Sequence, residues 1–65
     1  MNDDKIREAG LLALKASFEL NDVSRQKDSD IQHMHLGAGL LYLRKALDLA
    51  VAYDEELRRT EVGES

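Results

Sequence analysis

Two histidines and a nearby aspartate are the residues of this chain whose types best suit metal chemistry, and they lie in the segment Asp30-Ile31-Gln32-His33-Met34-His35. On a strand, His33 and His35 would face the same way and could bind one metal ion together. On a helix they point about 200° apart, so they cannot share an ion within one chain. Asp30 and His33 are three residues apart and share a helix face, which gives half of a di-metal motif of helical bundles.

Completing that motif would require carboxylates from a facing helix, which Glu19 or Asp22 could supply. The usual motif has Glu in place of Asp, and the apolar stripes of the first half of the chain contain no Glu. We therefore expect no metal site and no cofactor. The serine and threonine hydroxyls lack a neighbouring base and an oxyanion site at helical spacing, so we also expect a protein that is not an enzyme.

Arg44 and Lys45 form a basic pair that interrupts an otherwise apolar stretch of the chain. One interpretation is a solvated pair of charges. The other is a ligand site: repeated by symmetry in an oligomer, the pair could bind an anionic nucleotide, with His33 or His35 nearby. The sequence thus gives four candidate ligand-binding residues: Arg44, Lys45, His33 and His35.

Two glycines, Gly37 and Gly39, lie within a helical pattern, where each costs about 1 kcal/mol relative to alanine. A phosphate-binding loop would need a preceding strand, and none is predicted here. Close approach of another helix to the bare backbone is the favoured explanation, and a local break or kink near Gly37 is the alternative.

The chain of 65 residues contains 9 basic and 13 acidic side chains, which gives a net charge of −4, and it has no cysteine or proline. These counts exclude a disulfide scaffold and a thiolate metal site, and they disfavour nucleic-acid binding. No apolar run approaches the roughly 20 residues of a membrane span, and no signal peptide opens the chain. We expect a single domain over 1–65, in the cytoplasm of a cell or of an infected host.

Apolar residues recur with a helical period throughout the chain, so the predicted fold class is all-α. The pattern gives two helices, at about 3–22 and 30–59, and a polar, frayed C-terminal tail at 60–65. The first helix could extend as far as Gln26.

Polar side chains mark where each helix begins. Those at positions 2–4 supply cap oxygens and negative charge at the start of the first helix. Ser29 and Gln32 fit a capping box, in which each side chain would bond the backbone N–H of the other residue. This box predicts Ser29 as the cap of the second helix.

Each predicted helix carries two apolar stripes. The first has alternating spacings of three and four, is rich in alanine, and is typical of packed helix pairs. It predicts the core of the hairpin: Ile6, Ala9, Ala13, Ala16, Leu20, Leu36, Gly39, Leu43, Ala46, Ala50 and Tyr53. The second stripe would contact a further chain and is the predicted oligomer interface: Leu11, Leu14, Phe18, Ile31, Met34, Ala38 and Leu41.

Two helices with a short connection form an antiparallel hairpin, which covers only one stripe of each helix. Chains below roughly 70–80 residues also need more stabilisation than one small core supplies. We therefore expect self-association into a homo-oligomeric helical bundle, either a dimer or a higher oligomer. The second helix would extend about ten residues, roughly 15 Å, beyond the first, over Ala50 to Arg59.

The two predicted helices echo one another in sequence. The segment Ala9-Gly10-Leu11-Leu12-Ala13-Leu14-Lys15 recurs 29 residues later as Ala38-Gly39-Leu40-Leu41-Tyr42-Leu43-Arg44. An ancient duplication of one helix is one explanation. The general similarity of helices rich in leucine and alanine is the favoured one, because stable repeat arrays need about three copies.

The segment Lys5-Ile6-Arg7-Glu8-Ala9 is followed by a leucine-rich helix, a polar turn and the pattern Leu43…Ala46…Ala50-Val51-Ala52. In this the chain resembles the short helical hairpins with which phages sequester cyclic oligonucleotides. The resemblance implies a ring of hairpins that binds immune signalling nucleotides and blunts host defence without catalysis. The second helix of that family typically carries Trp and Asn in its later part. Here Lys45-Ala46-Leu47-Asp48-Leu49 has neither, so no ligand-binding residue is transferred.

The function expected from these observations is binding without catalysis. A self-associating hairpin would act as an inhibitor or adaptor of another protein through its leucine- and alanine-rich faces. The alternative is an anti-defence sponge that holds a nucleotide second messenger between protomers, at Arg44 and Lys45.

Overall fold

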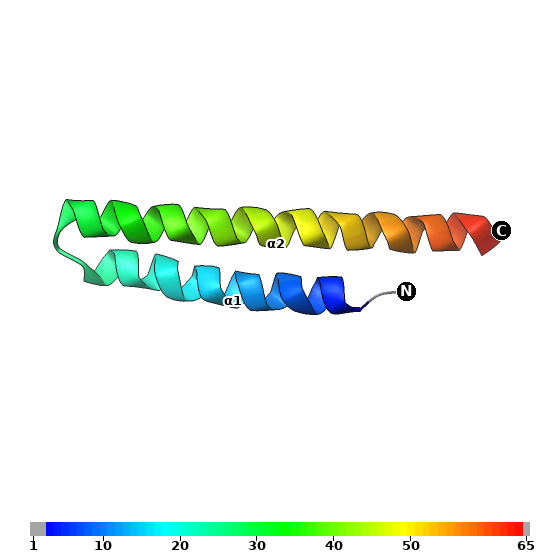
Figure 1. Ribbon diagram of the computed structural model, residues 1–65, viewed down its shortest axis with the longest axis horizontal. Helices are drawn as coiled ribbons and strands as arrows, with labels where there is room; N and C mark the ends of the chain where they lie inside the picture. The colour runs from blue at the N-terminus through cyan, green and yellow to red at the C-terminus, as the bar shows by residue number, and fades with distance from the viewer. Residues whose placement is uncertain (1–2, 65) are drawn as a thin grey trace.

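Two α-helices make up the computed structural model, which describes residues 3–64 and, for residues 61–64, the helical backbone alone. Helix α1 spans Asp4–Arg25 and helix α2 spans Ser29–Glu64. They run side by side in opposite directions, joined by a turn at 26–28 (Figure 1), and form a rod of 55 × 13 × 12 Å. The predicted all-α chain of two helices is confirmed. No helix in the described residues is long and apolar enough to cross a membrane.

Both helices continue beyond the predicted bounds of about 22 and 59, although α1 stays within the extension to Gln26 that the sequence allows. Helix α1 continues past Asp22 to Arg25, and α2 continues past Arg59 to Glu64. For most of the tail predicted at 60–65, the structure describes only the helical backbone of 61–64, and residue 65 lies outside the described residues. The overhang of α2 also begins later than predicted, because Glu56 still contacts the first turn of α1 through Lys5.

The start of α2 is capped by Asp28. Its Oδ1 accepts hydrogen bonds from the backbone N–H groups of Asp30 (2.8 Å) and Ile31 (3.4 Å). These two groups have no partner within the helix, so the carboxylate satisfies them and places negative charge at the positive end of the helix dipole. The capping box predicted at Ser29 and Gln32 is therefore wrong by one residue, because Ser29 is already the first residue of α2.

The side chain of Gln32 is engaged on the other side of the turn. Its Nε2 donates hydrogen bonds to the backbone carbonyls of Val23 (3.2 Å) and Gln26 (2.6 Å). The last carbonyls of a helix lack partners within it, so this amide satisfies two acceptors at the end of α1. One side chain of α2 thereby fixes where α1 ends, and we refer to this arrangement as the Gln32 clamp.

Replacing Asp28 by alanine should destabilise the protein by about 1 kcal/mol, the usual cost of removing an N-cap side chain. The matched change Ser29→Ala should alter the free energy of unfolding by only a few tenths of that amount, since Ser29 makes no capping bond. Urea unfolding of the two variants at one protein concentration measures the difference. Equal effects would contradict the assignment of Asp28 as the cap.

At the start of α1 the cap position belongs to Asp3, but its side chain makes no capping hydrogen bond. Its Oδ1 instead accepts a hydrogen bond from the Tyr53 hydroxyl (3.3 Å). Partial desolvation is the largest cause that raises the pKa of Tyr53, and the negative charge of Asp3 is the second. The side chain of Asp3, which was expected to cap α1, therefore connects α1 to α2 through the Tyr53 hydroxyl.

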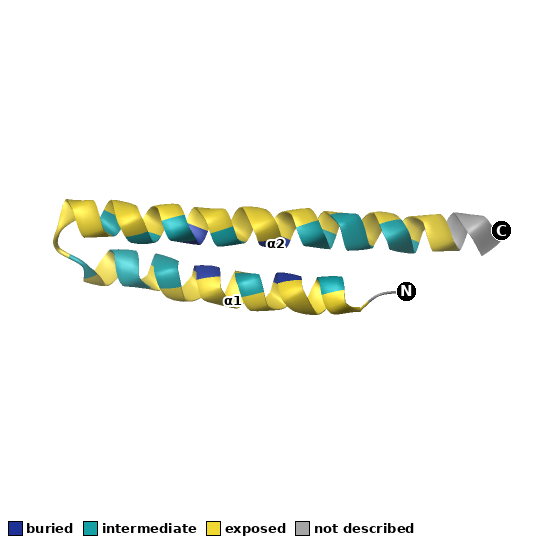
Figure 2. Cartoon of the chain, viewed as in Figure 1, coloured by how far each residue is buried: buried dark blue, intermediate teal, exposed yellow. Residues whose placement is uncertain are grey.

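Small residues form the contact between the two helices. Ala9, Ala16, Gly39 and Ala46 are the buried residues of the described part of the chain (Figure 2). A Cβ atom on Gly39 would lie 2.8 Å from Cδ2 of Leu20, so the bare backbone is what permits this approach. The predicted reason is confirmed for Gly39 but not for Gly37, because a Cβ atom on Gly37 would meet nothing within 4 Å. Helix α2 runs unbroken through both of its central glycines, so the alternative of a break in the helix is wrong.

The face that each helix turns to the other is rotated from the predicted one. Ala13 is exposed, and Ile6, Leu36 and Leu43 remain 39%, 38% and 40% exposed. The buried or half-buried members of the predicted stripe are Ala9, Ala16, Leu20, Gly39, Ala46, Ala50 and Tyr53. Half-buried inward positions that lie outside the predicted stripe include Leu12, Tyr42 and Leu49.

Three side-chain contacts set the register of the two helices. They are Lys5 Nζ to Glu56 Oε1 (2.5 Å), Lys15 Nζ over the Tyr42 ring (5.9 Å from its centre), and His35 Nδ1 with Glu19 Oε2 (2.6 Å). In this antiparallel register, Gly10 lies level with Leu47 and Ser17 lies level with Leu40.

The hydrogen bond from Lys5 lowers the pKa of Glu56, against a smaller opposing effect of desolvation. A carboxyl whose pKa is lowered by folding adds stability above its ordinary pKa of 4.5, and this stability is lost as the pH falls through the lowered value. Wild type should therefore melt at a higher temperature than Glu56→Gln at pH 7, and the difference should narrow between pH 7 and pH 3. A gap of the same size at both pH values would contradict this role of the pair.

Candidate functional site

A shallow groove runs along one side of the hairpin, between α1 and α2. We define the groove by its lining residues: Ile6, Ala9, Gly10, Ala13, Leu43, Ala46, Leu47 and Ala50. None of these side chains carries a charge or a hydrogen-bonding group. The groove therefore offers packing contacts alone, which suit the apolar face of another helix or hairpin.

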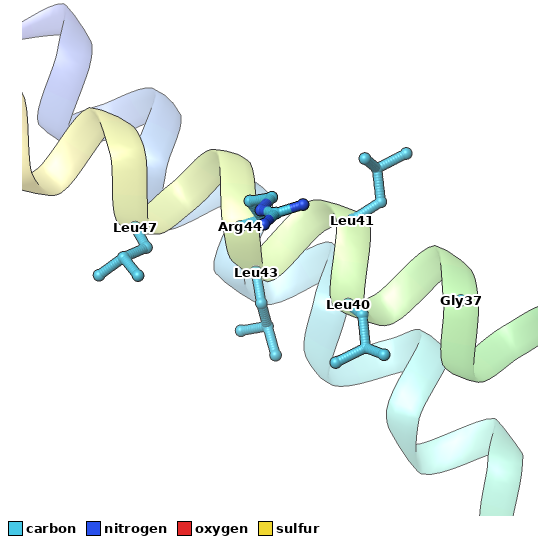
Figure 3. A pocket seen from close by; sticks show the side chains of 6 residues that line it. All are labelled: Gly37, Leu40, Leu41, Leu43, Arg44 and Leu47. Carbon is cyan, nitrogen blue, oxygen red and sulfur yellow. The ribbon is translucent and has the colours of Figure 1, made fainter.

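A row of leucines forms the α2 side of this groove and continues it toward the turn. Leu36, Leu40, Leu43 and Leu47, which we call the leucine ridge, are spaced by four, three and four residues. Figure 3 shows Leu40, Leu43 and Leu47 pointing to one side of α2, while Leu41 points to the other. All four ridge residues are exposed. This spacing is typical of a seam that packs against another helix.

The opposite side of the hairpin is polar. Lys15 and Glu19 are on the side of α1 away from the groove, and each reaches across to α2. Lys15 covers the ring of Tyr42, and Glu19 bonds His35, so charged groups shield this side of the helix contact from solvent. The hairpin therefore has an apolar side, which carries the groove, and an opposite polar side.

The four candidate ligand-binding residues do not converge in one chain. His35 is half-buried and paired with Glu19, whereas His33 is exposed on another side of α2. Arg44 borders a shallow hollow on the outer surface of α2 beside Gly37, where the remaining lining residues are all leucines (Figure 3). Lys45 is exposed and does not line this hollow. Within the described part of the chain, no three His, Asp or Glu side chains form a group that could hold a metal ion.

The residues of the predicted oligomer interface lie on separate surfaces of the hairpin. Leu11, Leu14 and Phe18 are exposed on the side of α1 that faces away from α2, and we call them the outer stripe. Ala38 is half-buried, while the other predicted members on α2 are exposed: Ile31, Met34 and Leu41. The groove was missed as a surface, although the spacing of the leucine ridge is visible in the sequence and could have indicated it.

The chain exposes more surface than a compact protein of its mass. Its accessible surface is 5120 Å², about 900 Å² above the roughly 4,200 Å² expected for a compact monomer of this size. In the described residues no large apolar side chain is fully buried, and twelve are exposed. Comparison of the chain with protein-family models, curated proteins and solved structures finds no match.

Proposed function

We propose that this chain is a non-enzymatic binding protein that self-associates and acts as an inhibitor or adaptor of another protein. The observation that supports this most strongly is its uncovered apolar surface. Twelve large apolar side chains are exposed on a chain whose buried residues are three alanines and one glycine in the described part. Apolar surface of this extent is typical of association sites in soluble proteins.

The exposed apolar residues form surfaces that point in different directions, so the chain has more than one place to bind. The groove and the leucine ridge occupy one side, and the outer stripe occupies the side of α1 away from α2. One surface can then join copies of the chain while the other contacts a different protein. Phe18, at 62% exposed, is the aromatic residue of the outer stripe, and aromatic side chains are enriched at protein interfaces.

Native mass spectrometry of untagged protein, prepared gently from cells, tests this proposal. A closed homo-oligomer without added mass is the expected result. A bare monomer at micromolar concentration would overturn the self-association. A closed oligomer carrying extra mass of nucleotide size would overturn the protein-binding function in favour of a nucleotide sponge, and Arg44→Ala with Lys45→Ala would then show whether the basic pair holds the ligand.

A further inference from the structure

We propose that the groove is the interface between two copies of this chain, with the leucine ridge of each copy seated over the small residues of α1 in the other. This inference rests on the proposed self-association and specifies its geometry. The product is a dimer of two hairpins, a four-helix bundle in which neighbouring helices are antiparallel.

The first argument is the area. Each chain exposes about 900 Å² more than a compact monomer of its mass, so two chains have about 1,800 Å² to cover. A stable protein interface buries about 1,600 ± 400 Å² in total. The excess is therefore of the size that one face-to-face contact between two hairpins buries.

The second argument is the shape of the two sides of the groove. The α2 side carries the large side chains of the ridge, whereas the α1 side carries Gly10 and Ala13, with Ile6 at one end and Ser17 continuing the same face of α1 beyond the groove. Packing ridge on ridge would crowd the leucines and leave a void between the two copies of α1. A two-fold axis parallel to the helices avoids both, because it places the ridge of each copy over the small residues of the other.

A two-fold axis parallel to the helices leaves the position of each residue along the rod unchanged. Leu47 of one copy then lies over Gly10 of the other, and Leu40 lies over Ser17. The contact between the two helices of one hairpin is also a leucine packed against a glycine, because Leu20 occupies the space beside Gly39. Gly10 stands 29 residues before Gly39 in the sequence echo, and a Cβ atom on it would meet nothing within 4 Å in the single chain. In the dimer that open space receives a leucine.

The third argument concerns the residues that the spacing pattern wrongly placed inside the hairpin. Ile6, Ala13 and Leu43 line the groove and Leu36 belongs to the ridge, so all four point in a direction intermediate between the other helix and the open side. In a four-helix bundle, the centre of the bundle lies in that intermediate direction for every helix. The exposed members of the stripe with spacings of three and four therefore belong to the core of the dimer, and its buried members belong to the contact within one hairpin.

Gly10→Gln and Gly37→Gln test the interface as a matched pair. Both glycines are helical, and neither would place a Cβ near another side chain of the single chain, but only Gly10 lines the groove. Gly10→Gln should raise the dimer dissociation constant about a hundredfold or more, because the inserted side chain occurs twice in each interface. Gly37→Gln should leave that constant within a few-fold of wild type. Analytical ultracentrifugation over a dilution series measures both.

The outcomes separate the interface from the proposed function. A wild-type monomer would overturn self-association itself. A wild-type dimer that Gly10→Gln leaves intact would overturn only the assignment of the groove as the interface. If the Gly10→Gln variant were unfolded at every concentration, cysteine cross-linking would decide how the two copies pack.

Cysteine cross-linking tests the order of helices directly, since the natural chain has no cysteine. A chain with Ser17→Cys and a chain with Leu40→Cys should form a mixed disulfide dimer when combined and oxidised. Each chain oxidised alone should yield several-fold less cross-linked dimer. Faster cross-linking of either variant with itself would overturn the placement of α2 over α1.

Discussion

The helix content of this chain should depend steeply on its concentration. Among the described residues of a single hairpin, only three alanines and one glycine are buried and the inward leucines are only half-buried, which gives little hydrophobic stabilisation against the entropy of ordering two long helices. If two copies stabilise each other, each tenfold dilution should remove about 1.4 kcal/mol from the free energy of unfolding of the dimer. Circular dichroism at 222 nm from high to low micromolar concentration, with melting curves at each, measures this.

The melting temperature should fall progressively over that dilution series. A shorter chain ending after Arg59 provides a control, because it lacks the part of α2 that extends beyond α1 and keeps the whole groove. We expect it to show the same concentration dependence as the full chain. A melting temperature independent of concentration over two decades, with full helix content throughout, would show that the hairpin is stable alone.

Leu47→Ala should destabilise the assembled protein by about 2–5 kcal/mol, the usual cost of truncating a buried leucine. Leu11→Ala is the matched control, because the two leucines are almost equally exposed in the single chain, at 63% and 61%. They differ in position: Leu47 lies on the ridge, and Leu11 lies on the outer stripe. We expect the control to change the free energy of unfolding by less than about 1 kcal/mol.

Chemical denaturation of both variants at one concentration, well above the dissociation constant, gives the comparison. Equal small effects would show that neither leucine becomes buried. A larger effect at Leu11 than at Leu47 would instead identify the outer stripe as the surface between copies, as the sequence pattern alone predicts. The double variant should be additive, because the two residues do not touch in the proposed dimer.

Much of the fold follows from the sequence because helical periodicity is strong throughout the chain. The two helices, their direction and the role of Gly39 all follow from spacing and composition. The inward face was harder to predict, because apolar residues cover more than half the circumference of α1. Leu12 and Ala13 are adjacent in sequence and both apolar, and only the contact with α2 shows that Leu12 is half-buried while Ala13 is exposed.

The turn shows a second kind of ambiguity. Asp28 and Ser29 are neighbouring residues that both favour the cap position, and the capping-box pattern selects Ser29. That pattern requires Gln32 to bond back to its own helix. The structure uses Gln32 for the carbonyls of α1 instead, which is a contact between helices and is not visible in local spacing.

The candidate site could be predicted only in part. Spacings of four, three and four in the leucine ridge are readable from the sequence, but the groove also needs the register that sets Gly10 opposite Leu47. That register depends on pairs such as Glu19 with His35, which join residues far apart in the chain. His35 was weighed as a ligand-binding residue, and its partner on the other helix could not be identified from one sequence.

The Gln32 clamp also sets the order in which the hairpin should form. Its hydrogen bonds join residues six and nine positions apart, whereas Lys5 and Glu56 at the open end are separated by 51 positions. Closing the longer loop first would cost about 2 kcal/mol more chain entropy than closing the shorter one. Folding should therefore begin at the turn and proceed toward the termini. In a pulse-labelling experiment, the amide hydrogens beside the turn should be the earliest to gain protection from exchange.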